Sequence, residues 1–313
     1  MKLFVTGVAG QLGHDVMNEL HKRGYEGVGS DLAPEYAGIQ DGSPVTAMPY
    51  VSMDITNAEA VERIITEIKP DAVVHCAAWT AVDAAEDEDK KETVRLVNVV
   101  GTENIAAVCK KLGIKMMYLS TDYVFDGQGT EPWQPDCKDY RPLNVYGQTK
   151  LDGELAVYNN VEKFFIIRIA WVFGKNGKNF IKTMLNLGKT HDTIRVVSDQ
   201  IGTPTYTYDL ARLMVDMIAT EKYGYYHATN EGGFISWYDF TKEIFRQAAA
   251  AGHPEYEPSK VNVVPVTTAE YGISKAARPF NSRLDKSKLS VNGFTPLPTW
   301  QDALSRYLKE IDF

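Results

Sequence analysis

Two side chains four residues apart have the types and spacing that proton transfer needs. A helix would place Tyr146 and Lys150 on one face, with the ammonium near the phenol. A neighbouring ammonium lowers the pKa of a phenol from about 10, and such a phenol can exchange a proton near neutral pH. The pair therefore predicts general acid–base chemistry, with solvent-facing helix residues as the alternative.

The spacing alone is not specific, because it recurs at Tyr238 with Lys242, Tyr256 with Lys260, and Tyr271 with Lys275. A proline interrupts one of these repeats, a glycine interrupts another, and the third follows no predicted cofactor-binding strand. Only Tyr146 follows a predicted buried strand that ends in hydroxyls, at Ser120 and Thr121.

These residues match what reduction of a carbonyl requires: a hydride from a nicotinamide, a proton for the developing alkoxide, and donors that polarise the carbonyl. Tyr146 would donate the proton, while Lys150 would hold the nicotinamide ribose. Thr121 would donate from its hydroxyl to the substrate oxygen. The neighbouring Asp122 either orients this network or caps the turn that follows.

A glycine-rich turn offers a site for such a cofactor. Thr6-Gly7-Val8-Ala9-Gly10-Gln11-Leu12-Gly13 follows the first apolar run and opens a helical pattern. Gly7 permits a tight turn, Gly10 lets the backbone approach a pyrophosphate, and Gly13 lets the helix pack close to the strand. The helix N-terminus adds N–H donors. We interpret Gly7, Gly10, Gln11, Leu12 and Gly13 as cofactor-binding residues, with a purely structural turn as the alternative.

An acidic residue ends the next predicted strand, because Asp31 lies 18 residues after Gly13. Its carboxylate can accept hydrogen bonds from an adenosine ribose but would repel a 2′-phosphate. The cofactor is therefore expected to be NADH or NADPH, with NAD favoured. Asp54 and Ile55 would suit the adenine through a polar edge and an apolar face, or Asp54 would simply begin a helix.

The elements that must position these residues are visible in the apolar patterning. Strands are expected at 2–6, 25–31, 50–53, 71–77, 114–120 and 164–170, and helices at 11–23, 57–67, 92–112 and from 147, while 33–48 looks irregular. Short apolar runs that alternate with helices are typical of parallel strands with crossover connections. Residues 1–170 are thus predicted to form an α/β domain, a Rossmann-type doubly wound parallel sheet.

The alternation loosens after residue 171. Shorter helices near 179–188, 208–219 and 237–250 are separated by isolated strands and by proline or glycine breaks. We expect residues 171–313 to form mainly a smaller, discontinuous substrate-binding lobe, with some segments returning to the Rossmann sheet. Because no repeat or Gly/Ser linker is present, the two lobes should pack together.

Composition excludes several classes of protein. The 313 residues are 44% hydrophobic and 24% charged, as in folded globular proteins. The 33 Lys and Arg against 41 Asp and Glu give a charge of -8, the wrong sign for a nucleic-acid binder. No apolar run approaches the roughly 18 residues of a membrane span and no signal-like segment is visible, so a cytoplasmic protein is expected. Cys76, Cys109 and Cys137 fit neither a disulfide framework nor zinc-ligand spacing.

Together these features resemble the extended short-chain dehydrogenase/reductase family, which uses a glycine-rich turn with a Ser/Thr, Tyr and Lys set. Within it the chain is most similar to the dTDP-4-dehydrorhamnose reductases. The resemblance is carried by motifs in both lobes: residues 77–83 (AAWTAVD), 119–125 (LSTDYVF), 142–150 (PLNVYGQTK), 199–205 (DQIGTPT) and 277–282 (ARPFNS), together with Arg168, Trp171, Asn179 and Phe180.

The resemblance implies reduction of the 4-keto group of dTDP-4-dehydro-6-deoxy-L-mannose to dTDP-L-rhamnose by NADH or NADPH. It implies that Thr121, Asp122 and Trp171 contact the sugar. The residues implied at the cofactor are Ala77, Ala78, Trp79, Thr80 and Leu119, and the matched motifs add Tyr123, Asn179 and Gln200 on the substrate side. Arg278 would clamp a pyrophosphate or lie as a surface arginine. Trp171 would wall the deoxy sugar or belong to the core.

The family often binds a divalent metal between subunits through glutamates, so a homodimer is one assembly that the resemblance allows. The corresponding position on the first helix is Asp15 here, and no convincing ligand set is present. We therefore predict no metal.

The same cofactor-binding turn and the Thr, Tyr and Lys set are compatible with other functions. A dehydratase needs an acid and a base beside the threonine, usually an adjacent Asp-Glu pair, whereas Asp122 is followed by Tyr123. Another nucleotide-sugar reductase, or an epimerase that recycles bound NAD, stays open. A non-catalytic, dinucleotide-binding regulatory subunit, similar to the beta subunit of methionine adenosyltransferase, also stays open, although Thr121, Tyr146 and Lys150 weigh against it.

Overall fold

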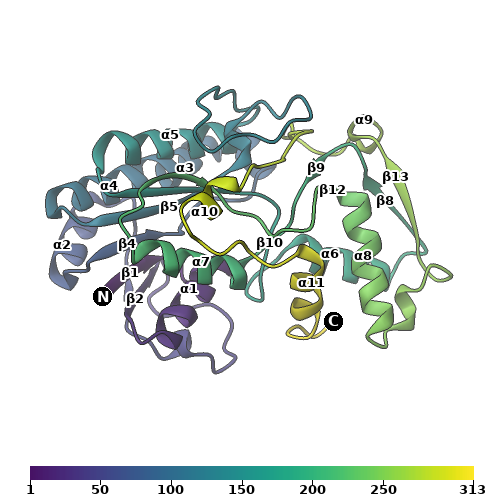
Figure 1. Cartoon of the computed structure of the whole chain (residues 1–313), viewed down its shortest axis with the longest axis horizontal. Coiled ribbons are helices and arrows are strands. Elements are labelled where there is room, and N and C mark those ends of the chain that lie inside the picture. Colours follow the sequence, from purple (N-terminus) through teal and green to yellow (C-terminus); the bar gives the residue numbers. More distant parts are fainter.

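Seven parallel strands form the central sheet of the computed structural model, which describes residues 1–313 (Figure 1). Their order is β11-β6-β5-β4-β1-β2-β3. The strands are β1 (Lys2–Thr6), β2 (Glu26–Asp31), β3 (Tyr50–Ser52), β4 (Ala72–His75), β5 (Lys115–Thr121), β6 (Phe164–Ile169) and β11 (Gly224–His227). From β1 the chain adds β2 and β3 on one side and then β4, β5 and β6 on the other, so the strand order reverses between β1 and β4. Such a reversal opens a crevice at the carboxyl ends of the strands. The predicted Rossmann-type fold is confirmed.

Helices cover both faces of this sheet. On one face lie α1 (Gln11–Lys22) and α7 (Thr207–Ile218), whose Val16, Leu20 and Leu210 are fully buried. On the other face lie α2 (Ala58–Ile68), α4 (Gly101–Leu112) and α5 (Val145–Asn160). A short α3 (Lys91–Arg95) and a π-helical segment (Leu96–Val100) run directly into α4, as the expected long helix over 92–112 requires. The strands between the two helix layers are apolar on both faces because both faces are covered.

The sheet layer also contains parts of the second half of the chain. Strand β11 pairs with β6, and α7 packs beside α1. None of the helices combines the length and apolarity needed to cross a membrane.

A second core lies beside the sheet, on the right in Figure 1. It is built on α6 (Phe180–Gly188), α8 (Trp237–Ala250), α11 (Trp300–Leu308) and the parallel pair of β8 (Thr193–Val197) with β13 (Asn262–Val266). The remaining elements are β7 (Val172–Phe173), β9 (Ile201–Gly202), β10 (Thr205–Tyr206), β12 (Ile235–Ser236), α9 (Thr268–Tyr271), α10 (Ser287–Val291) and single-turn helices at Pro44–Thr46, Ala84–Glu86, Asp122–Val124 and Pro254–Tyr256.

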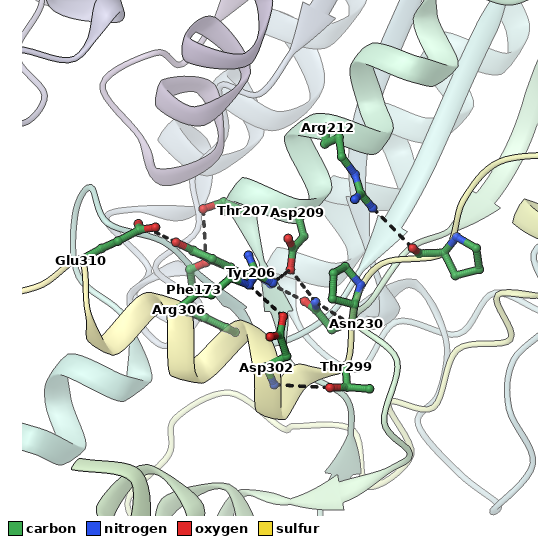
Figure 2. A network of polar contacts seen from close by, with 12 residues as sticks. Phe173, Tyr206, Thr207, Asp209, Arg212, Asn230, Thr299, Asp302, Arg306 and Glu310 are labelled. Atoms are coloured by element: carbon green, nitrogen blue, oxygen red, sulfur yellow. Dashed lines mark hydrogen bonds and ion pairs between the residues drawn. The ribbon is translucent and has the colours of Figure 1, made fainter. Parts of the chain in front are cut away.

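A polar network fastens α11 to α7 where the two cores meet (Figure 2). The buried Asp209 accepts hydrogen bonds from Arg306 at 2.7 Å and from Asn230 at 2.9 Å. Tyr206 donates from its hydroxyl to Glu310 at 2.6 Å. Because these contacts join segments from both cores, they fix the second core relative to the central sheet.

Candidate active site

A cavity of about 660 Å³ opens at the carboxyl ends of the central strands. It is lined by the segments that follow β1 to β6, and by Trp237 at the start of α8. Its size and its place at the reversal of strand order suit a bound cofactor and a small substrate.

Most of the candidate residues meet in this cavity. Its lining includes Gly7, Gly10, Gln11, Leu12, Gly13, Asp31, Asp54, Ile55, Ala77, Ala78, Thr80, Leu119, Thr121, Asp122, Tyr123, Tyr146, Lys150 and Trp171. Four candidates do not line it: Trp79, Asn179, Gln200 and Arg278.

The glycine-rich turn is packed too tightly for side chains. Gly7 has φ of +73°, and a Cβ there would lie 2.6 Å from the backbone nitrogen of Ala77. A Cβ on Gly13 would lie 2.3 Å from the carbonyl oxygen of Gly7. The carboxylate of Asp31 accepts a hydrogen bond from the Ala9 amide at 3.0 Å and so braces the turn. The close backbone approach leaves room for a ligand above the N-terminus of α1, as a dinucleotide pyrophosphate requires.

Three residues that line the cavity carry buried polar groups. The hydroxyls of Ser30 and Ser120 have no hydrogen-bond partner in the protein, whereas the carboxylate of Asp122 accepts hydrogen bonds from Thr121 and Ser282. Buried hydroxyls without a hydrogen bond are rare in native proteins, which distinguishes these two serines from the rest of the lining. Ser30 lies beside Asp31, and Ser120 and Asp122 flank Thr121 in the sequence.

Asn98, a residue that was not predicted from the sequence, holds the turn after β4. Its side chain accepts from the Trp79 amide at 2.8 Å, and donates to the Trp79 carbonyl at 3.2 Å and to Thr149 at 3.1 Å. It lies in the π-helical segment, a feature frequent at functional sites. The available signal was one asparagine between Val97 and Val99 in an otherwise apolar run of sequence.

Helix α5 brings Tyr146 and Lys150 to the cavity. Asn144 caps the helix by accepting from the Gly147 amide at 2.7 Å, and Glu86 accepts from the Val145 amide at 2.8 Å. Tyr146 lies in the first turn, and Lys150 follows one turn later with 3% of its surface exposed. The start of the helix is therefore fixed from two sides.

The predicted lowering of the Tyr146 pKa by Lys150 was wrong, because Lys150 is not among the groups that shift this pKa. Burial raises the pKa of Tyr146, and the nearby Asp122 raises it further, with only Thr121 opposing. The Lys150 ammonium instead lies 4.1 Å from the centroid of the Tyr118 ring. Tyr146 is therefore protonated at neutral pH, which is the form that a proton donor needs.

Burial also governs the other two charged groups of the site. It lowers the pKa of Lys150 to about 7, although the negative charge of Glu154 opposes the change. It raises the pKa of Asp122 to about 6, although hydrogen bonds from the hydroxyls of Ser282 and Thr121 oppose the change. Both groups can thus change charge near neutral pH.

Two stacked tryptophans form one wall of the cavity. The rings of Trp171 and Trp237 are 3.7 Å apart between centroids and nearly parallel, at 16°. Trp171 has φ of +52°, which is rare for a bulky residue and often marks a functional site. Trp237 was missed in the sequence because it comes from a helix 66 residues further along the chain.

The four candidates outside the lining have partners of their own. Arg278 pairs with Asp83 at 2.7 Å and donates to the Tyr123 hydroxyl at 3.0 Å. Asn179 caps α6 and donates to Gln11 at 3.1 Å, and Gln200 donates to Thr268 at 3.1 Å. The indole of Trp79 donates to the carbonyl of Ala81 at 3.1 Å. Their roles as ligand contacts stay predictions.

The position considered for a metal holds a buried carboxylate. Asp15 accepts a hydrogen bond from Thr207, and burial raises its pKa to about 7. No group of three or more His, Cys, Asp or Glu side chains is arranged to hold a metal ion.

Comparison with known proteins gives matches over the whole chain. Residues 1–313 match the RmlD substrate binding domain family. The dTDP-4-dehydrorhamnose reductase of Escherichia coli (strain K12) is 35% identical over 316 residues, covering 99% of this chain and 98% of that protein. The spore coat polysaccharide biosynthesis protein SpsK of Bacillus subtilis (strain 168) is 35% identical over 309 residues, covering 99% and 97%. The crystal structure of dTDP-4-dehydrorhamnose reductase from Bacillus anthracis str. Ames in complex with NADP superimposes with a TM-score of 0.85, at 38% identity, over 99% of this chain and 100% of that chain.

Proposed function

Because the chain belongs to the RmlD substrate binding domain family, we propose that it is an NAD(P)H-dependent oxidoreductase that makes dTDP-L-rhamnose. The substrate is dTDP-4-dehydro-6-deoxy-L-mannose (dTDP-4-dehydrorhamnose), whose 4-keto group is reduced. The observation that carries the proposal is the convergence of Thr121, Tyr146 and Lys150 with the glycine-rich turn on one cavity.

The residues of the chain divide the work of reduction. A bound nicotinamide supplies the hydride. Tyr146 holds a proton on its phenol and gives it to the oxygen of the former carbonyl. The Thr121 hydroxyl polarises that carbonyl, and the carboxylate of Asp122 accepts a hydrogen bond from a sugar hydroxyl. Trp171 covers the apolar face of the deoxy sugar.

Lys150 binds the nicotinamide ribose in this proposal, and its charge predicts a pH dependence. Its pKa of about 7 means that the ammonium form decreases as pH rises through neutrality. The affinity for NADH should therefore fall above about pH 7, by at most about tenfold per pH unit. Titrating NADH between about pH 6 and 9 measures this, and ADP, which lacks that ribose, serves as the control. An NADH affinity that is constant over this range, or an equal fall for ADP, would contradict the assignment.

Asp31 sets the preference between NADH and NADPH in this proposal. Asp31→Asn keeps the size of the side chain but removes the charge that repels a 2′-phosphate. The ratio of the NADPH to the NADH affinity should rise by about tenfold. Both affinities are measured by direct titration, because Asp31 also braces the turn through Ala9 and a common weakening must cancel in the ratio. An unchanged ratio would remove the role of Asp31 in selection.

The function is tested by following NADH and NADPH oxidation with the dTDP-sugar supplied by the two preceding enzymes of the pathway. A reductase consumes one equivalent of dinucleotide per sugar and releases dTDP-L-rhamnose. An epimerase recycles bound NAD and consumes none. A regulatory subunit binds the dinucleotide without turnover.

We also expect a cytoplasmic enzyme that acts on a small nucleotide sugar, with neither nucleic acid nor membrane as a partner. A homodimer is the assembly to test by sedimentation.

A further inference from the structure

We propose that Lys178, a residue of the second half of the chain, binds the pyrophosphate of the dinucleotide. The proposal rests on the function proposed above, because it takes the glycine-rich turn as the cofactor site. Lys178 lies in the segment between β7 and α6 and lines the same cavity as Gly10 and Gln11.

Two asparagines fasten this segment to the glycine-rich turn, one on each side of Lys178. Asn176, which is 6% exposed, donates to the carbonyls of Ala9 at 2.8 Å and Gly10 at 3.2 Å. Asn179 donates to the side chain of Gln11 at 3.1 Å. Since both neighbours are tied to the turn, Lys178 is held close to the N-terminus of α1.

Lys178 differs from the two nearest lysines along the chain, Lys175 in the same segment and Lys182 in the first turn of α6, in having no partner within the protein. Lys175 pairs with Asp41 at 2.6 Å. Lys182 donates to the carbonyls of Lys175 at 2.6 Å and Gly177 at 2.9 Å. The exposed Lys178 has neither a hydrogen bond nor an ion pair to another residue, and it lines the same cavity as the glycine-rich turn.

This combination of groups suits a pyrophosphate. The amides at the start of α1 bind phosphate oxygens as neutral donors, and an ammonium adds a charge-assisted hydrogen bond. The arginine that the sequence suggested as a clamp, Arg278, already pairs with Asp83 and does not line the cavity. The proximity to Gln11 favours the pyrophosphate of the dinucleotide over that of the nucleotide sugar.

The test compares ligand binding by Lys178→Met with that of the wild type. The dissociation constant for ADP-ribose, which carries the pyrophosphate, should rise by about tenfold, and less at high salt. Adenosine, which has no phosphate, and dTDP should bind as before. Lys178→Arg should restore ADP-ribose binding to within about twofold of the wild type. Lys189→Met, at an exposed lysine beyond α6, is the matched control and should change nothing.

A second variant tests how Lys178 is placed. Asn176→Ala releases the segment from the glycine-rich turn and should also weaken ADP-ribose binding. The double variant Asn176→Ala/Lys178→Met should bind ADP-ribose as tightly as Lys178→Met alone, because both substitutions act through one contact. Unchanged ADP-ribose binding by Lys178→Met, or weaker dTDP binding instead, would overturn the proposal. Since none of these measurements needs turnover, a failed reductase assay with intact ADP-ribose binding would refute only the proposed function.

Discussion

Tyr146→Phe is expected to lower kcat by about a thousandfold and to leave the dissociation constant of NADH within about twofold. The substitution removes only the phenolic hydroxyl. The ring keeps its edge contact with Tyr123, at 5.5 Å between centroids. Because burial keeps this phenol protonated at neutral pH, its loss removes the proton that the new alkoxide needs. Steady-state oxidation of NADH measures kcat, and fluorescence titration measures binding.

The matched control for this experiment is Tyr158→Phe. Tyr158 belongs to the same helix, but it is 45% exposed and lies outside the cavity lining. Its kcat should equal that of the wild type. A Tyr146→Phe variant that keeps more than about a tenth of the wild-type kcat would show that the proton comes from another group.

Arg168→Met is expected to lower the free energy of unfolding by about 3 to 5 kcal/mol. Arg168 and Glu154 are both fully buried and form a two-pronged pair at 2.8 Å. Removing the arginine leaves the Glu154 carboxylate without its counter-charge in the interior. The midpoint of urea denaturation, with an unchanged slope, measures the loss.

The double variant Glu154→Leu/Arg168→Met separates the charge from the packing. It removes both buried charges and should recover most of the stability that Arg168→Met loses, because an apolar pair replaces a buried ion pair at little cost. Glu154 lies one turn after Lys150 in α5, so the double variant should also lower the pKa of Lys150. A loss of less than about 1 kcal/mol in the free energy of unfolding of Arg168→Met would contradict the stabilising role of this buried ion pair.

The sheet was readable from the sequence because buried parallel strands are continuous apolar runs. Residues 72–75 and 164–169 are examples, and both form strands close to the predicted positions. Strand β11 was not predicted, because Gly224-Tyr225-Tyr226-His227 has no such run and becomes a strand only through its pairing with β6. Edge strands depend on their partner more than on their own sequence.

The site was readable where its residues share one short segment. The glycine-rich turn and the Tyr146–Lys150 pair are local patterns with a fixed geometry, and the family that they suggested is confirmed by the matches over the whole chain. Trp237 and Lys178 reach the cavity from separate elements, and Asn98 acts on it only through the backbone of Trp79, so no sequence spacing predicts these three residues.

Electrostatics was the least predictable part of the site. The sequence places an ammonium near Tyr146 but does not state the burial of either group, and burial determines the direction of both pKa changes. Arg278 shows the same limit. Its charge suggested a phosphate ligand. In the structure, however, its guanidinium pairs with the carboxylate of Asp83, which lies 195 residues earlier in the chain and could not be identified as its partner from the sequence.

The most direct test of the proposed reduction is to supply dTDP-4-dehydrorhamnose with NADH that carries deuterium at the transferred position, and to examine the product by mass spectrometry and NMR. The account predicts dTDP-L-rhamnose with a single deuterium at C4, formed in equal amount to the NADH consumed. A product without deuterium, or turnover without consumption of NADH, would contradict it.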